Sequence, residues 1–292
     1  MKTSSYRIYT IFLSFIVFTF LLVNFCLAQS SVNTAKIISN KLITLQTRQG
    51  VTQKFILIKP ENPIASVILL DGDGDYKMGS SFEKPTIGDG ENGTLIRSRA
   101  IYAKHGFIVA AMDKPSDHKT PPKFELGITP AFRMSRAHAE DIKAVISYLK
   151  KEADVPVWLV GMCMGALSAA NGGINIKEGI NGLVFLGAVT KPKPGPYARS
   201  YPNGIIDFNL DKIDVPTLII YNKDDECPET PPSEADKIKE ALQNSPMVDV
   251  IFLKGGNKPR SKPCYAMSYH GFYGIEKQLV SAVSDFIKSN SK

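Results

Sequence analysis

The residues whose types and spacing best suit chemistry are five in a row, GMCMG at positions 161–165. They follow an apolar run at 157–160, short enough for a buried strand, and precede small, helix-tolerant residues at 166–171. A sharp strand-to-helix turn of the form G-x-nucleophile-x-G presents a nucleophile at its tip. Glycine is required two residues before and after the tip, because side chains there would clash. We therefore predict that Cys163 is a nucleophile; the alternative is a buried cysteine in an ordinary turn.

A nucleophile of this kind requires a base, and the chain has four histidines. His105 ends a predicted helix, where the helix dipole favours it, while His138 lies within a helix and His118 in a loop. His270 alone lies between the last predicted strand and the last predicted helix. As a base it would take the proton of Cys163, and later protonate a leaving group or activate water. We predict this role for His270; the alternative is a surface histidine.

Alternating strands and helices must position these side chains. The alternation predicts an α/β fold, in which a mostly parallel sheet carries helices on both faces. Right-handed crossovers bring the carboxyl ends of parallel strands to one edge, where ligand chemistry collects. The loops that hold Cys163, Asp225 and His270 all follow strands at that edge. The predicted strands are 35–46, 52–59, 65–70, 107–112, 157–160, 182–189, 215–221 and 247–253, and the predicted helices are 94–105, 136–151, 166–171, 233–242 and 274–288.

From residue 37 to its C-terminus, the chain resembles an α/β-hydrolase. Catalytic triads of that fold follow the order nucleophile, acid, histidine, and the resemblance implies Cys163, Asp225 and His270 in these roles. Asp224 competes with Asp225 for the acid, and aligning the preceding YN dipeptide with the family's usual His-Gly favours Asp225. The acid would hold the tautomer of the histidine and stabilise its cation.

The resemblance also implies an oxyanion hole made of two backbone N–H groups. One belongs to Met164, and the other comes from the loop after the third predicted strand, with Asp73 favoured and Gly74 as the alternative. A cysteine nucleophile resembles the dienelactone hydrolase branch of the family. The wider pattern of Asp-Asp-x-Cys, Pro-Cys and His-Gly-Phe is similar to a group of secreted bacterial α/β-hydrolases of unknown substrate. Serine is usual at the nucleophile position of that group, so Cys163 departs from its pattern.

The chain has four cysteines, and one of them, Cys26, lies in a predicted leader. The mature chain would keep three, and an odd count leaves one thiol to explain. If Cys227 pairs with Cys264, the bond clamps the acid loop to the histidine loop and leaves Cys163 free. Closing that loop of about 35 residues would stabilise the fold by about 3 to 4 kcal/mol. A metal site from these two cysteines and His270 lacks any C-x-x-C or paired-His spacing, so we predict no metal and no cofactor.

The N-terminus has the pattern of a secretory signal. Two basic residues precede an apolar run at 8–23, and small residues at 26 and 28 suit a cleavage site. We predict a signal peptide over 1–28, cleaved after Ala28, followed by one hydrolase domain over 29–292. The protein would then be periplasmic or secreted, with no stable membrane anchor after cleavage. The alternative is a retained anchor, for which the apolar run is short.

The charge of the chain argues against a nucleic-acid partner. The formal net charge is +7, and removing the two basic residues of the leader leaves 33 basic against 28 acidic residues, or +5. The basic residues form no stripe and have no interleaved aromatic residues, which indicates a solvated surface. We predict an exported hydrolase that cleaves an ester, lactone or thioester of a small molecule through an acyl-enzyme. The alternatives are an acyltransferase and a catalytically inert binding protein with the same fold.

Overall fold

The computed structural model describes residues 34–72, 93–118 and 128–291. The predicted signal peptide and both Asp73 and Gly74 lie outside these ranges. The chain divides into two units, 1–34 and 35–292, and the described strands and helices all belong to the second unit. Within the described ranges, every helix is too short or too polar to span a membrane.

Eight strands form a single sheet, and their bounds follow the apolar runs of the sequence closely. The strands are β1 (Ile37–Arg48), β2 (Val51–Pro60), β3 (Ala65–Leu70), β4 (Phe107–Pro115), β5 (Val157–Met162), β6 (Gly182–Leu186), β7 (Thr217–Asn222) and β8 (Val248–Leu253). Their order in the sheet is β1-β2-β4-β3-β5-β6-β7-β8. β2 pairs antiparallel with β1 and with β4, while the other neighbours pair parallel. The prediction of a mostly parallel sheet is confirmed.

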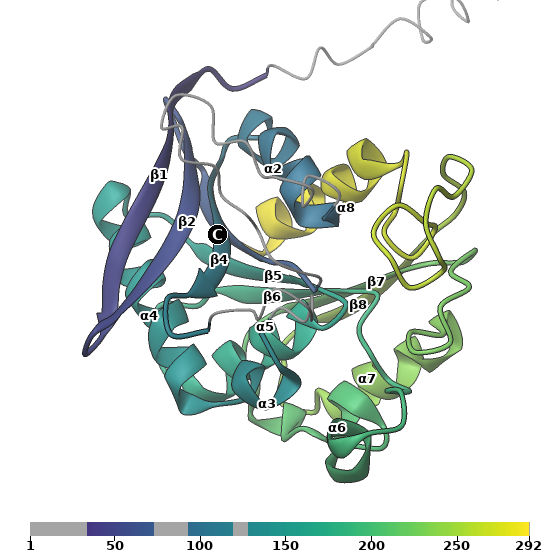
Figure 1. Ribbon diagram of the computed structural model, residues 1–292. Coiled ribbons are helices and arrows are strands. Elements are labelled where there is room, and N and C mark those ends of the chain that lie inside the picture. The colour runs from purple at the N-terminus through teal and green to yellow at the C-terminus, as the bar shows by residue number, and fades with distance from the viewer. Residues whose placement is uncertain (1–33, 73–92, 119–127, 292) are drawn as a thin grey trace, which may run out of the picture. The chain divides into compact units, whose positions relative to one another are not determined.

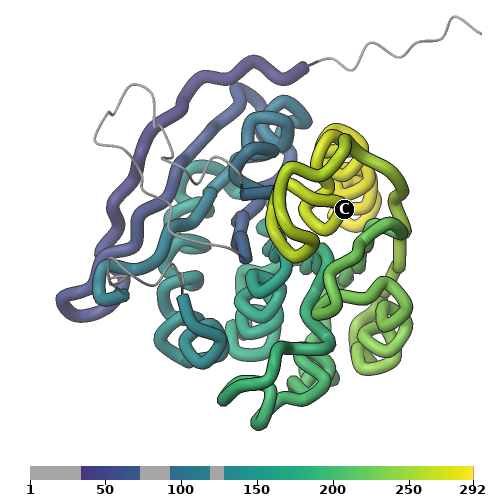
Figure 2. The backbone as a smooth tube through the Cα atoms, turned by 45° about the vertical axis from the view of Figure 1, so that its right-hand side comes forward, coloured from purple at the N-terminus to yellow at the C-terminus, as the bar shows by residue number. Residues whose placement is uncertain are grey.

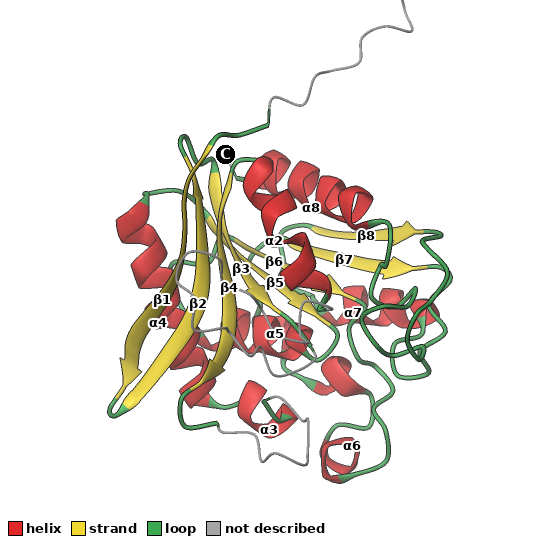
Figure 3. Ribbon diagram, turned by 45° about the horizontal axis from the view of Figure 1, so that its top comes forward, coloured by secondary structure: helices red, strands yellow, loops and turns green. Residues whose placement is uncertain are grey.

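Helices cover both faces of the sheet, as predicted (Figure 1). The described α-helices are α2 (Thr94–Lys104), α3 (Pro130–Arg133), α4 (Arg136–Glu152), α5 (Gly165–Asn175), α6 (Pro196–Ser200), α7 (Ala235–Ala241) and α8 (Glu276–Asn290), and three short 3-10 helices cover Gly204–Asp207, Leu210–Lys212 and Pro232–Glu234. Figure 3 shows α2 and α8 together on one face, and α4, α5 and α7 on the other. The two groups of helices bury two separate hydrophobic clusters against the sheet.

The central strand β3 shows why these apolar runs become buried strands. Successive side chains of a strand point to opposite faces. Val67 and Leu69 therefore join the cluster under α2 and α8, while Ile68 and Leu70 join the cluster under α4, α5 and α7. A strand covered on both faces has to be apolar at nearly every position, which is the pattern of a parallel sheet between helical layers.

The predicted ends of strands and helices differ from the observed ones by up to four residues, and two short α-helices were not predicted. The predicted strand at 182–189 ends at Leu186, because Gly187 turns the chain with φ 49° in the left-handed region. The predicted helices include neither α3, which lies between β4 and α4, nor α6, which lies between β6 and β7. Both short helices begin at a proline, whose fixed φ suits a first helical position. Helices this short have no apolar period for a sequence pattern to reveal.

The carboxyl edge of the sheet gathers loops that are distant in the sequence. The long segment between β8 and α8, yellow-green in Figure 2, lies beside the loop that follows β7. A disulfide between Cys227 and Cys264 joins the two segments. The turn between β5 and α5 opens at the same edge, since β5, β6, β7 and β8 run parallel.

Candidate active site

Cys163 lies between β5 and α5 in a strained turn. Its φ is 54°, in the left-handed region that a residue with a side chain seldom adopts. Among the described residues other than glycine, only Phe272 shares this feature, with φ 53°. The N–H of Cys163 donates to the carbonyl oxygen of Leu186 on the next strand at 2.9 Å, which holds the turn in place. Such strain is concentrated at functional sites, where the surrounding structure maintains it.

The two glycines that flank Cys163 allow the turn to be this tight. A Cβ atom on Gly161 would lie 2.7 Å from the Cα atom of Ala166 and even closer to Gly165. A Cβ atom on Gly165 would collide with the backbone of Leu70 and come within 3.0 Å of the carbonyl carbon of Asp71. Helix α5 can therefore start directly against the end of β3 only if both positions are glycine.

His270 and Asp225 form a buried pair at the same edge of the sheet. The Nδ1 atom of His270 lies 2.9 Å from Oδ2 of Asp225, and both side chains are 1% exposed. The other carboxylate oxygen of Asp225 accepts a hydrogen bond from the N–H of Cys227 at 2.8 Å. Asp224 contacts a different segment, because its Oδ2 atom accepts from the N–H of Gly255 at 2.8 Å. Of the two competing acids, the structure therefore brings Asp225 to the histidine.

The imidazole of His270 experiences opposing electrostatic effects. Burial lowers the pKa of His270. The negative charge of a Cys163 thiolate, together with the hydrogen bond and charge of Asp225, raises this pKa by more than burial lowers it, so the pKa lies well above its usual value. No described residue meets ordinary hydrogen-bond geometry at the buried Nε2 atom, but the Cys163 side chain lies near enough to raise the pKa of the ring. Gly187 provides room for the ring, since a Cβ atom there would lie 3.2 Å from Cε1 of His270. The ring thus has one nitrogen bound to an acid and the other free to exchange a proton.

Thr230 is a member of this cluster that the sequence did not reveal. Its hydroxyl donates to Oδ2 of Asp225 at 2.9 Å and lies 3.0 Å from Nδ1 of His270. Thr230 is completely buried. In the sequence it is one threonine in the run CPETPP, where nothing distinguishes it from a loop residue on the surface.

Of the two predicted oxyanion-hole donors, the structure describes only Met164. Met164 precedes α5 as its N-cap residue, so its N–H lies ahead of the first hydrogen bond within the helix. Asp73 and its alternative Gly74 lie outside the described residues. Gly72 directly precedes them, and a Cβ atom on it would lie 2.7 Å from Cβ of Cys163 and 3.0 Å from the nitrogen of Met164. The start of the loop after β3 therefore lies directly against the nucleophile turn.

Asp71 has a structural role beside this turn. Its Oδ2 atom accepts from the N–H groups of Leu95 and Ile96, at 2.9 and 3.4 Å, at the start of α2. Its Oδ1 atom accepts from the N–H of Gly72 at 2.9 Å. Burial raises the pKa of Asp71, while these hydrogen bonds oppose the increase. The carboxylate therefore caps α2, an arrangement that favours an acidic group at a helix N-terminus.

The cysteines divide into a disulfide and a thiol. The sulfur atoms of Cys227 and Cys264 are 2.07 Å apart, and their Cα atoms are 4.6 Å apart. Cys163 is the free cysteine of the described chain. The bond links the segment that holds Asp225 to the segment that holds His270.

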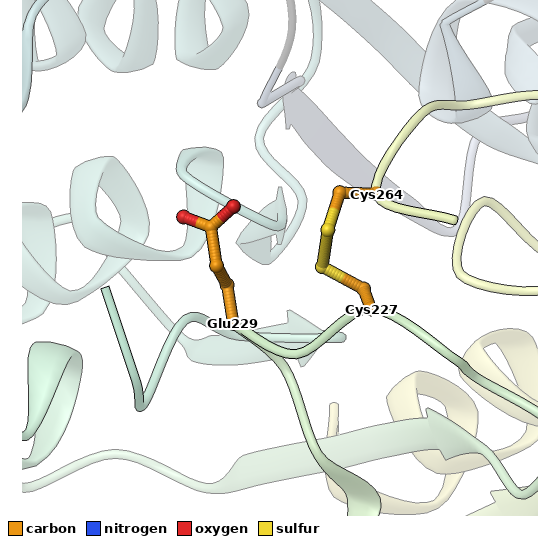
Figure 4. Close-up of side chains that lie close together, drawn as sticks. All are labelled: Cys227, Glu229 and Cys264. Atoms are coloured by element: carbon orange, nitrogen blue, oxygen red, sulfur yellow. A yellow bond between two sulfur atoms is a disulfide. The ribbon is translucent and has the colours of Figure 1, made fainter. Parts of the chain in front are cut away.

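Glu229 lies beside the disulfide (Figure 4). Together with Cys227 and Cys264 it forms the one group of possible metal ligands in the described chain, with ligand atoms within 4.8 Å of one another. The two sulfurs are bonded to each other, so neither is a thiolate that would bind a metal. The carboxylate of Glu229 pairs instead with Nζ of Lys193 at 2.8 Å. We therefore assign no metal to this group.

Comparison with known proteins finds similar three-dimensional structures and no match to a family model or a curated sequence. The esterase Pf2001 of Pyrococcus furiosus is 17% identical, with a TM-score of 0.58, over 87% of this chain and 93% of that protein. Est1E from Butyrivibrio proteoclasticus is 15% identical, with a TM-score of 0.56, over 86% of this chain and 98% of its own.

A third similar structure is the α/β serine hydrolase XC6422 of Xanthomonas campestris, described as lacking a lid. It is 13% identical, with a TM-score of 0.53, over 86% of this chain and 94% of that protein. Identities this low do not transfer an activity from one protein to another. The shared arrangement of strands and helices nevertheless extends over most of both chains in each comparison. From its strand order, its helical layers and these similarities, we conclude that the protein has the α/β-hydrolase fold.

Proposed function

We propose that the protein is an exported hydrolase that cleaves ester, lactone or thioester bonds through an acyl-enzyme. Cys163 is the nucleophile, His270 the base, and Asp225 the acid that orients the base. The observation that carries this proposal is the buried contact of 2.9 Å between His270 and Asp225, beside a cysteine held at φ 54° on a strand-to-helix turn. The likeness to a solved esterase supports it at the level of the fold.

Acylation begins when Nε2 of His270 takes the thiol proton of Cys163 and the sulfur attacks the carbonyl carbon of the substrate. The carbonyl electron pair moves onto oxygen, where the N–H of Met164 stabilises the negative charge. The bond to the leaving group then breaks, and His270 gives that group its proton. In deacylation His270 takes a proton from water, the resulting hydroxide attacks the thioester carbonyl, and the sulfur leaves as His270 returns the proton. Asp225 stabilises the imidazolium in both halves of the reaction.

The sulfur nucleophile narrows the class of substrate. A thiolate attacks well, but it is also a good leaving group, so the tetrahedral intermediate tends to return to substrate. The reaction goes forward when the substrate's own leaving group is better than a thiolate or is protonated by His270. Activated esters, enol lactones and thioesters should therefore react faster than simple alkyl esters, and amides slowest.

The test is a panel of an aryl ester, a lactone and a thioester, assayed with the purified protein and with the Cys163→Ala variant. We expect the variant to lose at least about a hundredfold in kcat on the aryl ester. Mass spectrometry of the wild type mixed with a slow substrate should find the acyl group on the peptide that contains Cys163. When iodoacetamide alkylates this thiol, the fraction of turnover that is lost should equal the fraction of Cys163 that is alkylated.

Two outcomes would favour the alternatives. If added alcohol diverts the acyl group from water to a new ester, the protein is an acyltransferase. If the wild type is inactive on the whole panel and Cys163 alkylates slowly at neutral pH, the protein is a binding protein with a hydrolase fold.

Export is tested separately. The disulfide fits an oxidising compartment, which supports this part of the proposal. The mass of the intact exported protein should correspond to a chain that starts at Gln29. A mature protein that retains residues 1–28 would favour a membrane anchor instead.

A further inference from the structure

We propose that Arg133 is a positioning residue that fixes the start of the loop after β3 against the nucleophile turn. The start of this loop consists of Asp71 and Gly72, and we call it the β3 loop. The inference rests on the proposed function, because Arg133 would hold the backbone directly before the predicted oxyanion donor Asp73, and that donor would stabilise the charged oxygen of the substrate. It concerns a residue that neither the triad nor the oxyanion donors include.

The guanidinium of Arg133 joins the β3 loop to helix α5. Its Nη2 atom donates to the carbonyl oxygens of Asp71 and Gly72, both at 3.0 Å. Its Nη1 atom donates to Oγ of Ser168 on α5, also at 3.0 Å. The Nε atom donates to the carbonyl oxygen of Ile128 at 3.3 Å. Arg133 is 3% exposed, so these hydrogen bonds are formed away from competing water.

The same helix also holds the backbone of Arg133. The side-chain amide of Asn171 donates to the carbonyl oxygens of Arg133 and Ser135, both at 2.9 Å. Ser168 and Asn171 are three residues apart, so they share one face of α5. Ser168 and Asn171, on one face of α5, therefore hold the side chain and the backbone of Arg133, respectively.

The contacts of Gly72 connect this clamp to the chemistry. A Cβ atom on Gly72 would lie 2.6 Å from the carbonyl oxygen of Met162, 2.7 Å from Cβ of Cys163 and 3.0 Å from the nitrogen of Met164. Because a peptide group is planar, hydrogen bonds to two successive carbonyls fix the orientation of the backbone beside the nucleophile. The planar guanidinium can donate in several directions at once, which the ammonium of a lysine cannot reproduce with the same geometry.

Two kinetic measurements distinguish a residue that positions the β3 loop from one that only stabilises the fold around the nucleophile turn. Alkylation of Cys163 by iodoacetamide requires a reactive sulfur but develops no oxyanion. Hydrolysis of an ester requires both the sulfur and the oxyanion donors. A residue that positions the β3 loop should therefore affect hydrolysis and leave alkylation unchanged, whereas a distorted nucleophile turn should slow both.

The experiment compares Arg133→Met and Arg133→Lys with the matched control Arg136→Met, which removes an exposed arginine three residues away. For Arg133→Met we expect kcat on an aryl ester to fall about a hundredfold, the scale of losing one oxyanion donor. Arg133→Lys should lose about tenfold, because it keeps the charge but not the fork of donors. For both variants the KM and the rate of Cys163 alkylation should stay within about twofold of the wild type. Arg136→Met should match the wild type in all three quantities.

Two results would overturn the inference while leaving the proposed function intact. In the first, the wild type hydrolyses the ester and Arg133→Met is equally active. In the second, alkylation slows as much as hydrolysis does. A wild type that hydrolyses no ester would instead refute the proposed function. If the Arg133 variants do not fold, Ser168→Ala removes only the acceptor on α5, and it should lower kcat about threefold to tenfold with alkylation unchanged; wild-type kcat in a folded Ser168→Ala protein would equally count against the clamp.

Discussion

Two histidines of this protein are buried to the same extent, and their pKa values shift in opposite directions. His270 is 2% exposed and His138 is 1% exposed. The pKa of His270 lies well above its usual value, whereas that of His138 is lowered to about 3. Burial lowers the pKa of both rings, so the difference has to come from the groups around them.

The described residues around His138 supply positive charge and no acceptor for a ring N–H. Burial is the largest cause of its lowered pKa, followed by the charges of Arg133, His118 and Arg48. Among the residues that the structure describes, neither ring nitrogen of His138 has a hydrogen-bond partner. The ring packs against Phe132, with centroids 5.1 Å apart. This histidine therefore stays neutral at physiological pH and cannot cycle a proton.

The surroundings of His270 are the reverse. A carboxylate and a hydroxyl, from Asp225 and Thr230, lie within 3.0 Å of Nδ1, and the sulfur of Cys163 acts on the ring from nearby. A buried histidine with an acid beside it thus keeps a raised pKa, whereas burial without such a partner keeps the ring of His138 neutral. The comparison predicts which changes should remove function and which should alter only stability.

The largest expected effect distinguishes the two histidines by activity. His270→Ala should lower kcat on an aryl ester by at least about a hundredfold, because no other group takes the thiol proton. His138→Leu should change kcat by less than about threefold, since its ring nitrogens contact no reacting group. Steady-state kinetics of the two variants at pH 7 test this difference. Equal losses in both variants would remove the distinction between a catalytic and a structural histidine.

The next effect separates the two neighbouring acids. Asp225→Asn should lower kcat by about tenfold to a hundredfold, less than the loss of His270, because the histidine remains but loses its orienting charge. The same variant should lower the pKa of His270, since the hydrogen bond and charge of Asp225 raise it. Titration of the imidazole by NMR measures that change.

Asp224→Asn is the matched control for Asp225→Asn. Its carboxylate holds the N–H of Gly255 and does not contact the ring, so kcat and the pKa of His270 should stay close to the wild type. An Asp224 variant with the larger loss would transfer the role of the acid to that residue.

A third effect concerns acid stability, where the two histidines act in opposite directions. An unfolded histidine has a pKa near 6.5, and folded His138 has one of about 3. Between these values the unfolded chain binds more protons, so this group destabilises the fold as the pH falls below about 6.5. The opposite sign holds for His270, whose raised pKa contributes stability that is fully present below about 6.5 and is lost as the pH rises through the folded value.

Urea denaturation at pH 6.5 and pH 5 measures the contribution of His138. The wild type should lose about 1.5 kcal/mol of unfolding free energy from this group over that interval. His138→Leu should lose that much less. Identical slopes in the wild type and in His138→Leu would show that His138 is not the titrating group.

Much of this architecture could be predicted because it depends on local pattern. Strand β3 has the predicted bounds, since a strand buried on both faces is a short apolar run. Helix α4 begins after Ser135 as predicted, and the Ser135 hydroxyl accepts from the N–H of His138 at 3.2 Å. The order of motifs along the chain likewise indicated which histidine and which acid meet at the carboxyl edge of the sheet.

The roles of Arg133 and Thr230 could not be predicted because they depend on contacts between distant segments. Arg133 reaches Ser168 across 35 positions and Asp71 across 62. Thr230 meets His270 across 40 positions. Neither residue belongs to a spacing motif, and α3, which carries Arg133, is too short to show an apolar period. Only the folded chain reveals which donors and acceptors these side chains join.

The smallest effect tests how firmly the acid beside His270 is held. Thr230→Val removes the hydroxyl that donates to Oδ2 of Asp225 at 2.9 Å but keeps the shape of the side chain. The N–H of Cys227 still binds the other carboxylate oxygen at 2.8 Å, so Asp225 should remain near the ring with more freedom. We expect kcat to fall about threefold to tenfold, the scale of one hydrogen bond to a charged group, with KM unchanged. Thr230→Ser keeps the hydroxyl and should restore most of the activity. A Thr230→Val enzyme with wild-type kcat would mean that Cys227 and His270 alone orient Asp225, and the buried hydroxyl would then contribute to stability only.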